Sequence, residues 1–342
     1  MSLVTVPSRI TGAWRVAQGV SVVTALGVTA LLVVRPDLGL LLTWKVLVPL
    51  VPAVLLFAPQ IWRNLCPIGV MNQLPSKLGF GGTRRLSARA QRNTPLIAIG
   101  LFFAIVPLRL TVFDQNGLAL AVFVVALLAV AVVGGVLVTG KGGWCATLCP
   151  VLPVERLYGQ QPILDAPHAH CDACTGCIRS CYDLKPERSL DELVKGRNGK
   201  TGILRRPTGI FGVAFPGFVL GYFTAATDAV AAGAGTLGAY GWVFAFAIAS
   251  ALLGGAIQWI TKATDRRMVQ ASAALAAGLY YWFTAPAIVA ALDAALSGSV
   301  ATGVMWALRL AFLSLATAWF VTTVRQREPR RGSWIRRPAP LR

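Results

Sequence analysis

Long apolar stretches are the feature that most restricts how this chain can fold. Eight of them reach the roughly 20 residues that an α-helix needs to cross the hydrocarbon core of a bilayer. They lie at about residues 13–34, 38–58, 95–113, 118–139, 210–231, 237–260, 268–292 and 301–324. With 56% hydrophobic residues and a mean hydropathy of +0.65, the chain of 342 residues is too apolar for a soluble enzyme of this size. The sequence therefore predicts an all-α polytopic membrane protein with about eight transmembrane helices arranged in hairpins.

Positive charge is distributed unevenly between the two sides of these spans. All but four of the 32 Lys and Arg residues fall in segments on one side, and the exceptions are Arg35, Lys45, Arg109 and Arg309. The positive-inside rule then predicts that both termini are cytoplasmic, in a bacterial inner (plasma) membrane. The net charge of +19 reflects this topology and contact with anionic membrane lipid, so we expect no nucleic-acid partner.

Most of the seven cysteines lie in the segment 140–182. Cys171, Cys174, Cys177 and Cys181, hereafter the ferredoxin run, have the spacing C-x2-C-x2-C-x3-C that bacterial ferredoxins use to bind a [4Fe–4S] cluster. A zinc site normally has two ligand pairs separated by a dozen or more residues, and a c-type haem requires a His directly after a C-x2-C pair. Neither pattern is present. The run therefore predicts a cytoplasmic ferredoxin-like iron–sulfur loop.

The remaining cysteines, Cys66, Cys145 and Cys149, are hereafter the membrane trio. Cys66 and Cys149 each stand in a Leu-Cys-Pro sequence that directly follows a pair of spans. Aligning the two sequences relates residues 13–75 to residues 95–158 as an internal repeat. The predicted organisation is given by four segments: duplicated transmembrane hairpins with Cys-Pro motifs (1–158), a cytoplasmic ferredoxin-type cluster segment and linker (159–209), four further transmembrane helices (210–324) and a basic cytoplasmic tail (325–342).

These motifs resemble the NapH/NosR-type membrane polyferredoxins, in which four helices carry two C-x3-C-P motifs at their cytoplasmic ends, followed by ferredoxin cysteines. The resemblance covers about residues 13–182. The second motif matches at Cys145 and Cys149, whereas the first matches at Cys66 alone, because Trp62 stands where the other cysteine would be. Tyr182 also replaces the proline that usually follows the ferredoxin run. The resemblance implies electron transfer through membrane-bound [4Fe–4S] clusters.

The cysteine count leaves the ligation of a second cluster open, because two cubanes normally take eight thiolates and the chain has seven cysteines. In one arrangement, Cys181 joins the membrane trio on the second cluster, and the rest of the ferredoxin run holds the first. In the other, the run completes its own cluster and the trio has an open corner. The nearest candidates for the missing ligand in the sequence are His168, His170 and Asp172. A single ferredoxin cluster, with the membrane trio inert, is the remaining alternative.

His168 and His170 are the two histidines of the chain, and both lie in the predicted cytoplasmic loop. No span can therefore supply the axial histidines of a b-type haem, and we expect no haem b or c. Electrons should stay at the cytoplasmic face or pass to a quinone or a partner subunit. The sequence also lacks the motifs of nucleophilic or metal-dependent hydrolysis. An electron-transfer subunit of a quinol-linked oxidoreductase is therefore favoured over a stand-alone enzyme.

The resulting hypothesis is a membrane-bound iron–sulfur protein that relays electrons between the quinone pool or a soluble ferredoxin and a partner reductase. The alternative is a redox sensor or a maturation factor for another metalloenzyme. Arg309 lies in the middle third of the last span, where an ionisable side chain is costly and typically functional. We interpret it as a quinone or partner contact, with structural pairing to a backbone carbonyl as the alternative. Arg109, near the outer end of the third span, is expected to extend its head group to the membrane interface.

Overall fold

The computed structural model describes residues 8–84, 86–138, 140–159, 163–164, 202–296 and 302–325. Within these ranges the regular secondary structure is helical, without strands. Eight helical segments are long and apolar enough to cross a membrane, which confirms the predicted number. They are Gly12–Val34, Pro36–Phe57, Leu96–Phe113, Gly117–Leu137, Pro207–Ala231, Gly235–Thr261, Asp265–Asp293 and Gly303–Arg325. The ferredoxin run and its neighbours His168, His170 and Asp172 lie outside the described residues.

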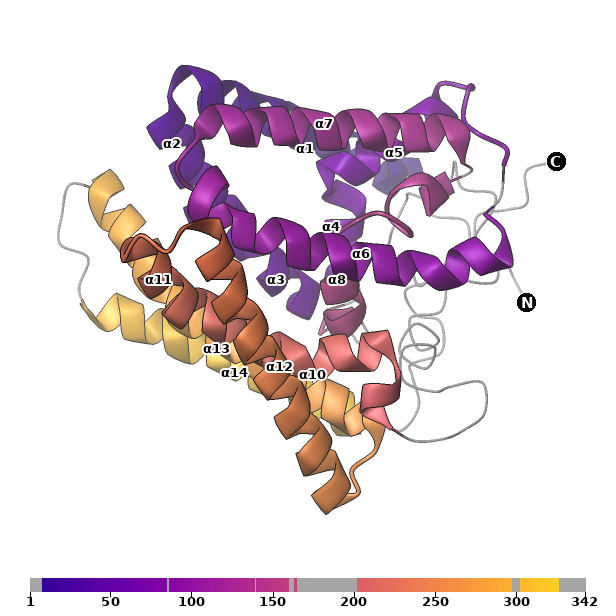
Figure 1. Ribbon diagram of the computed structural model, residues 1–342. Coiled ribbons are helices and arrows are strands. Elements are labelled where there is room, and N and C mark those ends of the chain that lie inside the picture. Colours follow the sequence, from indigo (N-terminus) through magenta and orange to yellow (C-terminus); the bar gives the residue numbers. More distant parts are fainter. Residues whose placement is uncertain are drawn as a thin grey trace.

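The first four spans make up the first half of the described structure. Their helices are α1 (Ser8–Val34), α2 (Pro36–Leu41), α3 (Val48–Phe57), α6 (Ala88–Leu108) and α7 (Gly117–Leu137). Asn116 caps α7, since its side chain accepts a hydrogen bond of 2.9 Å from the backbone N–H of Ala119. Helices α1 and α7 run side by side (Figure 1). Gly117 permits this close approach, because a Cβ there would lie 2.4 Å from the carbonyl oxygen of Leu32 in α1.

The last four spans form a second group of helices. These are α10 (Pro207–Gly221) with α11 (Thr227–Ala231), α12 (Gly235–Thr261), α13 (Asp265–Leu296) and α14 (Thr302–Arg325). Helix α10 is central, because 72% of its apolar window is buried, against 33% or less for the other spans. Phe211 and Phe218 of α10 pack edge-on against Phe102 and Phe103 of α6, with ring centroids 5.6 and 5.0 Å apart. This aromatic contact joins the two halves of the protein.

Three spans contain a π-helical turn, and the three turns meet at Arg109. The turns are Leu42–Leu47 between α2 and α3, Arg109–Phe113 after α6, and Tyr222–Ala226 after α10. The guanidinium carbon of Arg109 lies 4.3 Å from the ring centroid of Trp44 and 5.9 Å from that of Tyr222. Its Nε donates to Asp114 at 2.9 Å. Arg109 therefore pairs with Asp114 at the end of its own span and contacts aromatic rings of two other spans. The sequence predicted only that its head group extends to the membrane interface, so these contacts are additional.

Short helices carry the Cys-Pro sequences into the interior of the first half. They are α4 (Pro59–Leu65), α5 (Pro67–Lys77) and, after the 3₁₀ turn Gly140–Gly143, α8 (Leu152–Tyr158). Figure 1 shows α4, α5 and α8 among the long helices. Helix α5 packs along α7, and Asn72 donates a hydrogen bond of 2.9 Å to the carbonyl oxygen of Ala131 in α7. The Cys-Pro segments thus lie alongside the apolar spans.

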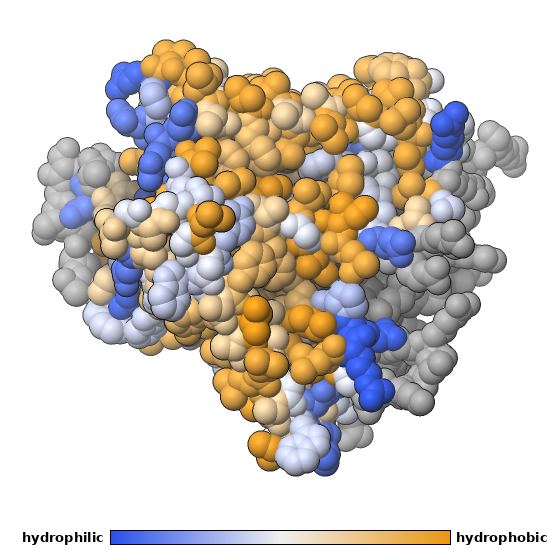
Figure 2. All heavy atoms as spheres, in the orientation of Figure 1, coloured by the Kyte–Doolittle hydropathy of each residue, from blue (hydrophilic) through white to orange (hydrophobic). Residues whose placement is uncertain are grey.

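The surface over the long helices is largely apolar. Figure 2 shows broad hydrophobic areas, with hydrophilic residues gathered mainly at the margins of the view. Large apolar side chains such as Val122 in α7, Leu253 in α12 and Leu310 in α14 are more than half exposed. In water such a surface would cause aggregation, whereas in a bilayer it contacts lipid tails.

Candidate functional site

Two thiols of the membrane trio, those of Cys66 and Cys145, lie beside Gly69 of α5. A Cβ on this glycine would lie 3.4 Å from the Sγ of Cys145 and 3.9 Å from the Sγ of Cys66. Cys149 packs against Ala98 of α6 and Leu152 of α8, and its thiol interacts electrostatically with those of Cys145 and Cys66. No disulfide joins the three. The fold therefore brings together cysteines from two segments that are far apart in the sequence. The sequence alone related these segments only through their shared Leu-Cys-Pro motif.

Both Cys-Pro sequences precede a helix: Cys66 stands directly before α5, and Cys149 stands three residues before the first residue of α8. Cys66 is the N-cap of α5 and Pro67 is its first residue, where the fixed φ of proline favours helix initiation. The backbone N–H groups of Ile68 and Gly69 act as hydrogen-bond donors to the Cys66 thiol. At the second site, the N–H of Val151 does the same for Cys149. Free N–H groups at the start of a helix stabilise negative charge, so both positions favour a metal-bound thiolate.

Two adjacent glycines in α7 bring the two cysteine segments to the same place. A Cβ on Gly135 would lie 2.0 Å from the backbone oxygen of Asn72 in α5, and a Cβ on Gly134 would lie 2.5 Å from that of Gly143. Gly143 stands two residues before Cys145, and Asn72 lies in the helix that Cys66 begins. Helix α7 is therefore the surface against which both segments pack, and a side chain at either glycine would separate them.

Buried ionisable side chains surround the trio. The Nε of Arg63 lies 2.5 Å from the Oε1 of Glu155, and the two side chains are only 3% and 7% exposed. Arg63 is one helical turn before Cys66, and Glu155 follows Cys149 in α8. Lys141 is also buried, at 5% exposure, and its charge acts on the Cys66 thiol. The site thus contains two cationic side chains and one carboxylate.

Burial controls the protonation of the thiols. It raises the pKa of Cys66 to about 11, and the nearby carboxylate of Glu155 acts in the same direction. The helix N–H groups and Lys141 partly oppose this effect. Burial likewise raises the pKa of Cys149 well above its ordinary value, with further contributions from the other two cysteines. At neutral pH the thiols of Cys66 and Cys149 are therefore uncharged, and a bound metal would have to displace their protons.

The donor set is sulfur-rich, which suits an iron–sulfur cluster. Among the described residues, no three His, Cys, Asp or Glu side chains converge on a single position for one metal ion. A cubane differs from a lone ion, because each of its irons takes its own protein ligand and the sulfurs therefore surround the cluster at a distance from each other. Three thiols that interact with one another electrostatically, two of them beside the same glycine, fit the larger group better than a mononuclear site.

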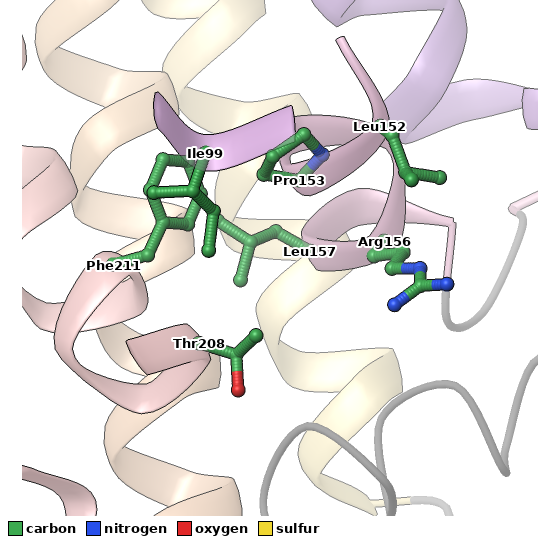
Figure 3. Close-up of a pocket in the computed structure, with 7 residues that line it drawn as sticks. All are labelled: Ile99, Leu152, Pro153, Arg156, Leu157, Thr208 and Phe211. Atoms are coloured by element: carbon green, nitrogen blue, oxygen red, sulfur yellow. The ribbon is translucent and has the colours of Figure 1, made fainter. Parts of the chain in front are cut away.

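A hollow lies on the other side of α8, between α6 and α10. Figure 3 shows it lined by Ile99 of α6, by Thr208 and Phe211 of α10, and by the α8 side chains Leu152, Pro153, Arg156 and Leu157. Its cavity volume is about 10 Å³, the space of roughly one water molecule. A quinone ring does not fit there in this conformation.

Arg309 is engaged in contacts within the second half. Its Nε donates a hydrogen bond of 3.1 Å to the backbone carbonyl of Trp282 in α13. Its guanidinium carbon lies 4.3 Å from the ring centroid of Trp282 and 5.1 Å from that of Trp306. The pairing with a backbone carbonyl, one of the two interpretations of this residue, is therefore present. A quinone or partner contact at Arg309 stays a prediction.

Reasoning from the sequence identified the thiols but missed Arg63, Lys141 and Glu155 as parts of the site. The available signal was weak: each of these residues lies within six positions of a cysteine of the trio, in segments otherwise poor in charge. Their burial and their pairing across the two segments follow from the tertiary structure alone.

Comparison of the chain with known proteins gives no independent support for a family. The resemblance to NapH/NosR-type polyferredoxins rests on the cysteine motifs and stays a prediction. No protein-family model, no curated protein and no solved structure matches this chain.

Proposed function

We propose that this protein is a membrane-bound iron–sulfur electron-transfer protein with two [4Fe–4S] clusters. The ferredoxin run would hold one cluster in a cytoplasmic loop, and the membrane trio the second on the cytoplasmic side of the apolar spans, in a bacterial inner membrane. The observation that carries the proposal is the convergence of Cys66, Cys145 and Cys149 from two separate Cys-Pro segments. Thiolates in this number and arrangement are the ligands of iron–sulfur chemistry, and such a cluster supplies one-electron transfer.

The charge of the surroundings supports an anionic cofactor. A cubane with thiolate ligands carries net negative charge, and buried charge is tolerated where opposite charge or hydrogen-bond donors compensate it. Arg63, Lys141 and the N–H groups at the start of α5 supply positive charge and donors near the trio. A cluster that replaces the protons of these thiols would therefore place its negative charge beside donors and a cation that partly offset the cost of burial.

The depth of the site supports a lipid-soluble redox partner. The hydroxyl of Ser21 in α1 donates to the carbonyl oxygen of Leu65, directly before Cys66. Ser21 lies about 13 Å along α1 from Gly12, the first residue of the apolar span, at 1.5 Å per residue. The Cys66 segment is thus level with the apolar part of α1. A quinone that diffuses in the bilayer could approach a cluster at this depth, and we propose an electron path between the quinone pool or a soluble ferredoxin and a partner reductase.

Iron and acid-labile sulfide per chain, measured on protein purified without oxygen, test this function. We expect about eight of each for the unaltered protein and about four for Cys145→Ser, because the ferredoxin run keeps its own cluster. Ala146→Ser is the matched control, since it introduces the same side chain one residue away and should keep about eight irons. About four irons in all three proteins would exclude the membrane trio as a cluster site, and zinc without iron would exclude the proposal as a whole.

A further inference from the structure

The membrane trio leaves one corner of a cubane without a cysteine among the described residues. We infer that the carboxylate of Glu155 is the ligand at this corner. The inference rests on the proposed function, because it presupposes a cluster at the trio. It differs from both ligation schemes drawn from the sequence, which place Cys181, His168, His170 or Asp172 at the open position.

Glu155 is the acidic side chain that the fold places at the trio. It is 5% exposed, it lies in α8 directly after the Cys149 segment, and its charge acts on the thiols of both Cys66 and Cys149. The other acidic residues of the described part are elsewhere. Asp37, Asp114, Asp228 and Asp293 belong to the opposite ends of the spans, and Asp265 binds Gln258 and the N–H of Gly202. The described ranges contain no histidine.

One oxygen of this carboxylate is held in place by Arg63. Oε1 accepts the 2.5 Å hydrogen bond from the Nε of Arg63, and within the described part of the chain Glu155 has no further side-chain hydrogen bond. Metal-binding carboxylates are commonly oriented by such a bond to their second oxygen. Arg63 stands three residues before Cys66, so the ion pair also ties the carboxylate to the segment that carries this cysteine.

Trp62 stands where the first motif would have its other cysteine, so a different residue must supply the fourth ligand of the cluster. Trp62 occupies the place four residues before Cys66, and its carbonyl oxygen accepts the backbone N–H of Cys66 at 2.8 Å. Its side chain packs against the main hydrophobic core, so it offers no ligand to iron. The second segment supplies two thiols and Glu155, and the first supplies one thiol and the arginine that orients Glu155. The two segments together thus hold four candidate donors.

Electron paramagnetic resonance of the oxidised protein, together with iron content, tests the inference. A [4Fe–4S] cluster that loses its ligand at one corner tends to lose that iron, and the [3Fe–4S] product is paramagnetic when oxidised. We expect Glu155→Gln to produce this signal and to lower the iron content by about one per chain, since a neutral amide keeps the shape but binds iron weakly. Glu155→Cys should keep about eight irons per chain and give no [3Fe–4S] signal, with altered g-values after reduction, and it keeps the test usable if the glutamine variant does not accumulate.

A control variant separates ligation from the general loss of a buried acid. Asp265→Asn removes another buried carboxylate, which binds Gln258 and the N–H of Gly202, and it should leave the spectrum and the iron content unaltered. If Asp265→Asn gave the same signal as Glu155→Gln, the role of Glu155 would be structural only.

The inference and the proposed function fail in different ways. An unaltered spectrum and about eight irons in Glu155→Gln, with about four irons in Cys145→Ser, would overturn the inference while leaving the second cluster in place. An iron content that Cys145→Ser does not change would overturn the second cluster itself, and with it the inference.

Discussion

Lys141 is a buried cation next to the proposed cluster, in the turn between α7 and Cys145. A lysine at 5% exposure has lost most of its hydration, which is costly unless negative charge or polar groups lie nearby. Its charge acts on the thiol of Cys66, so it would also act on a cluster bound there. Because reduction adds an electron, a nearby positive charge stabilises the reduced cluster and raises its potential.

Replacing Lys141 by Met should therefore lower the reduction potential of the cluster at the membrane trio. At an effective dielectric constant near 20, the loss of one nearby unit charge is worth on the order of 1–2 kcal/mol, which corresponds to a shift on the order of 50 mV or more. A redox titration followed by paramagnetic resonance measures this shift. Lys77→Met is the matched control, because Lys77 stands at the far end of α5, where its Nζ donates to Gln18. A potential that rises or stays constant in Lys141→Met would show that this side chain does not face the cluster.

At the scale of elements, α7 serves as the surface on which both cysteine segments pack. Its adjacent glycines Gly134 and Gly135 contact different segments, one at Gly143 and the other at Asn72. Small residues of this kind let backbones approach closely inside a membrane, where hydrophobic burial between helices contributes little. The geometry of the site thus depends on two positions that carry no side chain.

Gly135→Ala should disrupt the membrane trio while leaving the ferredoxin run intact. The new methyl group would lie 2.0 Å from the backbone oxygen of Asn72, so α5 must move away from α7, at a cost of about 1–3 kcal/mol. We expect iron content to fall toward half and the melting temperature to decrease. Gly100→Ala in α6 is the control, because nothing lies within 4 Å of a Cβ at that position. Equal iron in both variants would argue against α7 as the packing surface.

The long helices could be predicted from the sequence, whereas the helices that build the site could not. Twenty apolar residues in a row have few alternatives to a spanning helix, which is why the number of spans was confirmed. Helices α4 and α8 have seven residues each, too short for a periodic pattern, and each begins near a proline. The π-helical turns at Trp44, Arg109 and Tyr222 likewise arise from contacts between spans, not from local sequence.

In the molecule as a whole, the second group of helices supports the cysteine site from the other side. The hydroxyl of Tyr158, the last residue of α8, donates a hydrogen bond of 2.9 Å to the carbonyl oxygen of Ala273 in α13. Trp319 of α14 donates from Nε1 to the carbonyl oxygen of Tyr158 at 3.1 Å, and the two rings pack edge to face. Helix α8 is therefore held in place by the second half of the chain as well as by the first half, which carries the Cys-Pro motifs. This gives the four helices that lack cysteines a structural role in the site.

Trp319→Ala should accordingly weaken the cluster at the membrane trio, although Trp319 lies far from every cysteine in the sequence. The side chain is fully buried, so its removal leaves a cavity and an unpaired carbonyl at Tyr158, a loss of about 3–5 kcal/mol. We expect faster removal of about half of the iron by a chelator, because α8 and Cys149 are released together, while the ferredoxin run keeps its cluster. Trp306→Ala is the matched control, since Trp306 lies on the same helix but is 46% exposed. If both variants lost iron at the rate of the unaltered protein, the last four helices would not stabilise the site, and their function would have to be sought in contacts with a partner.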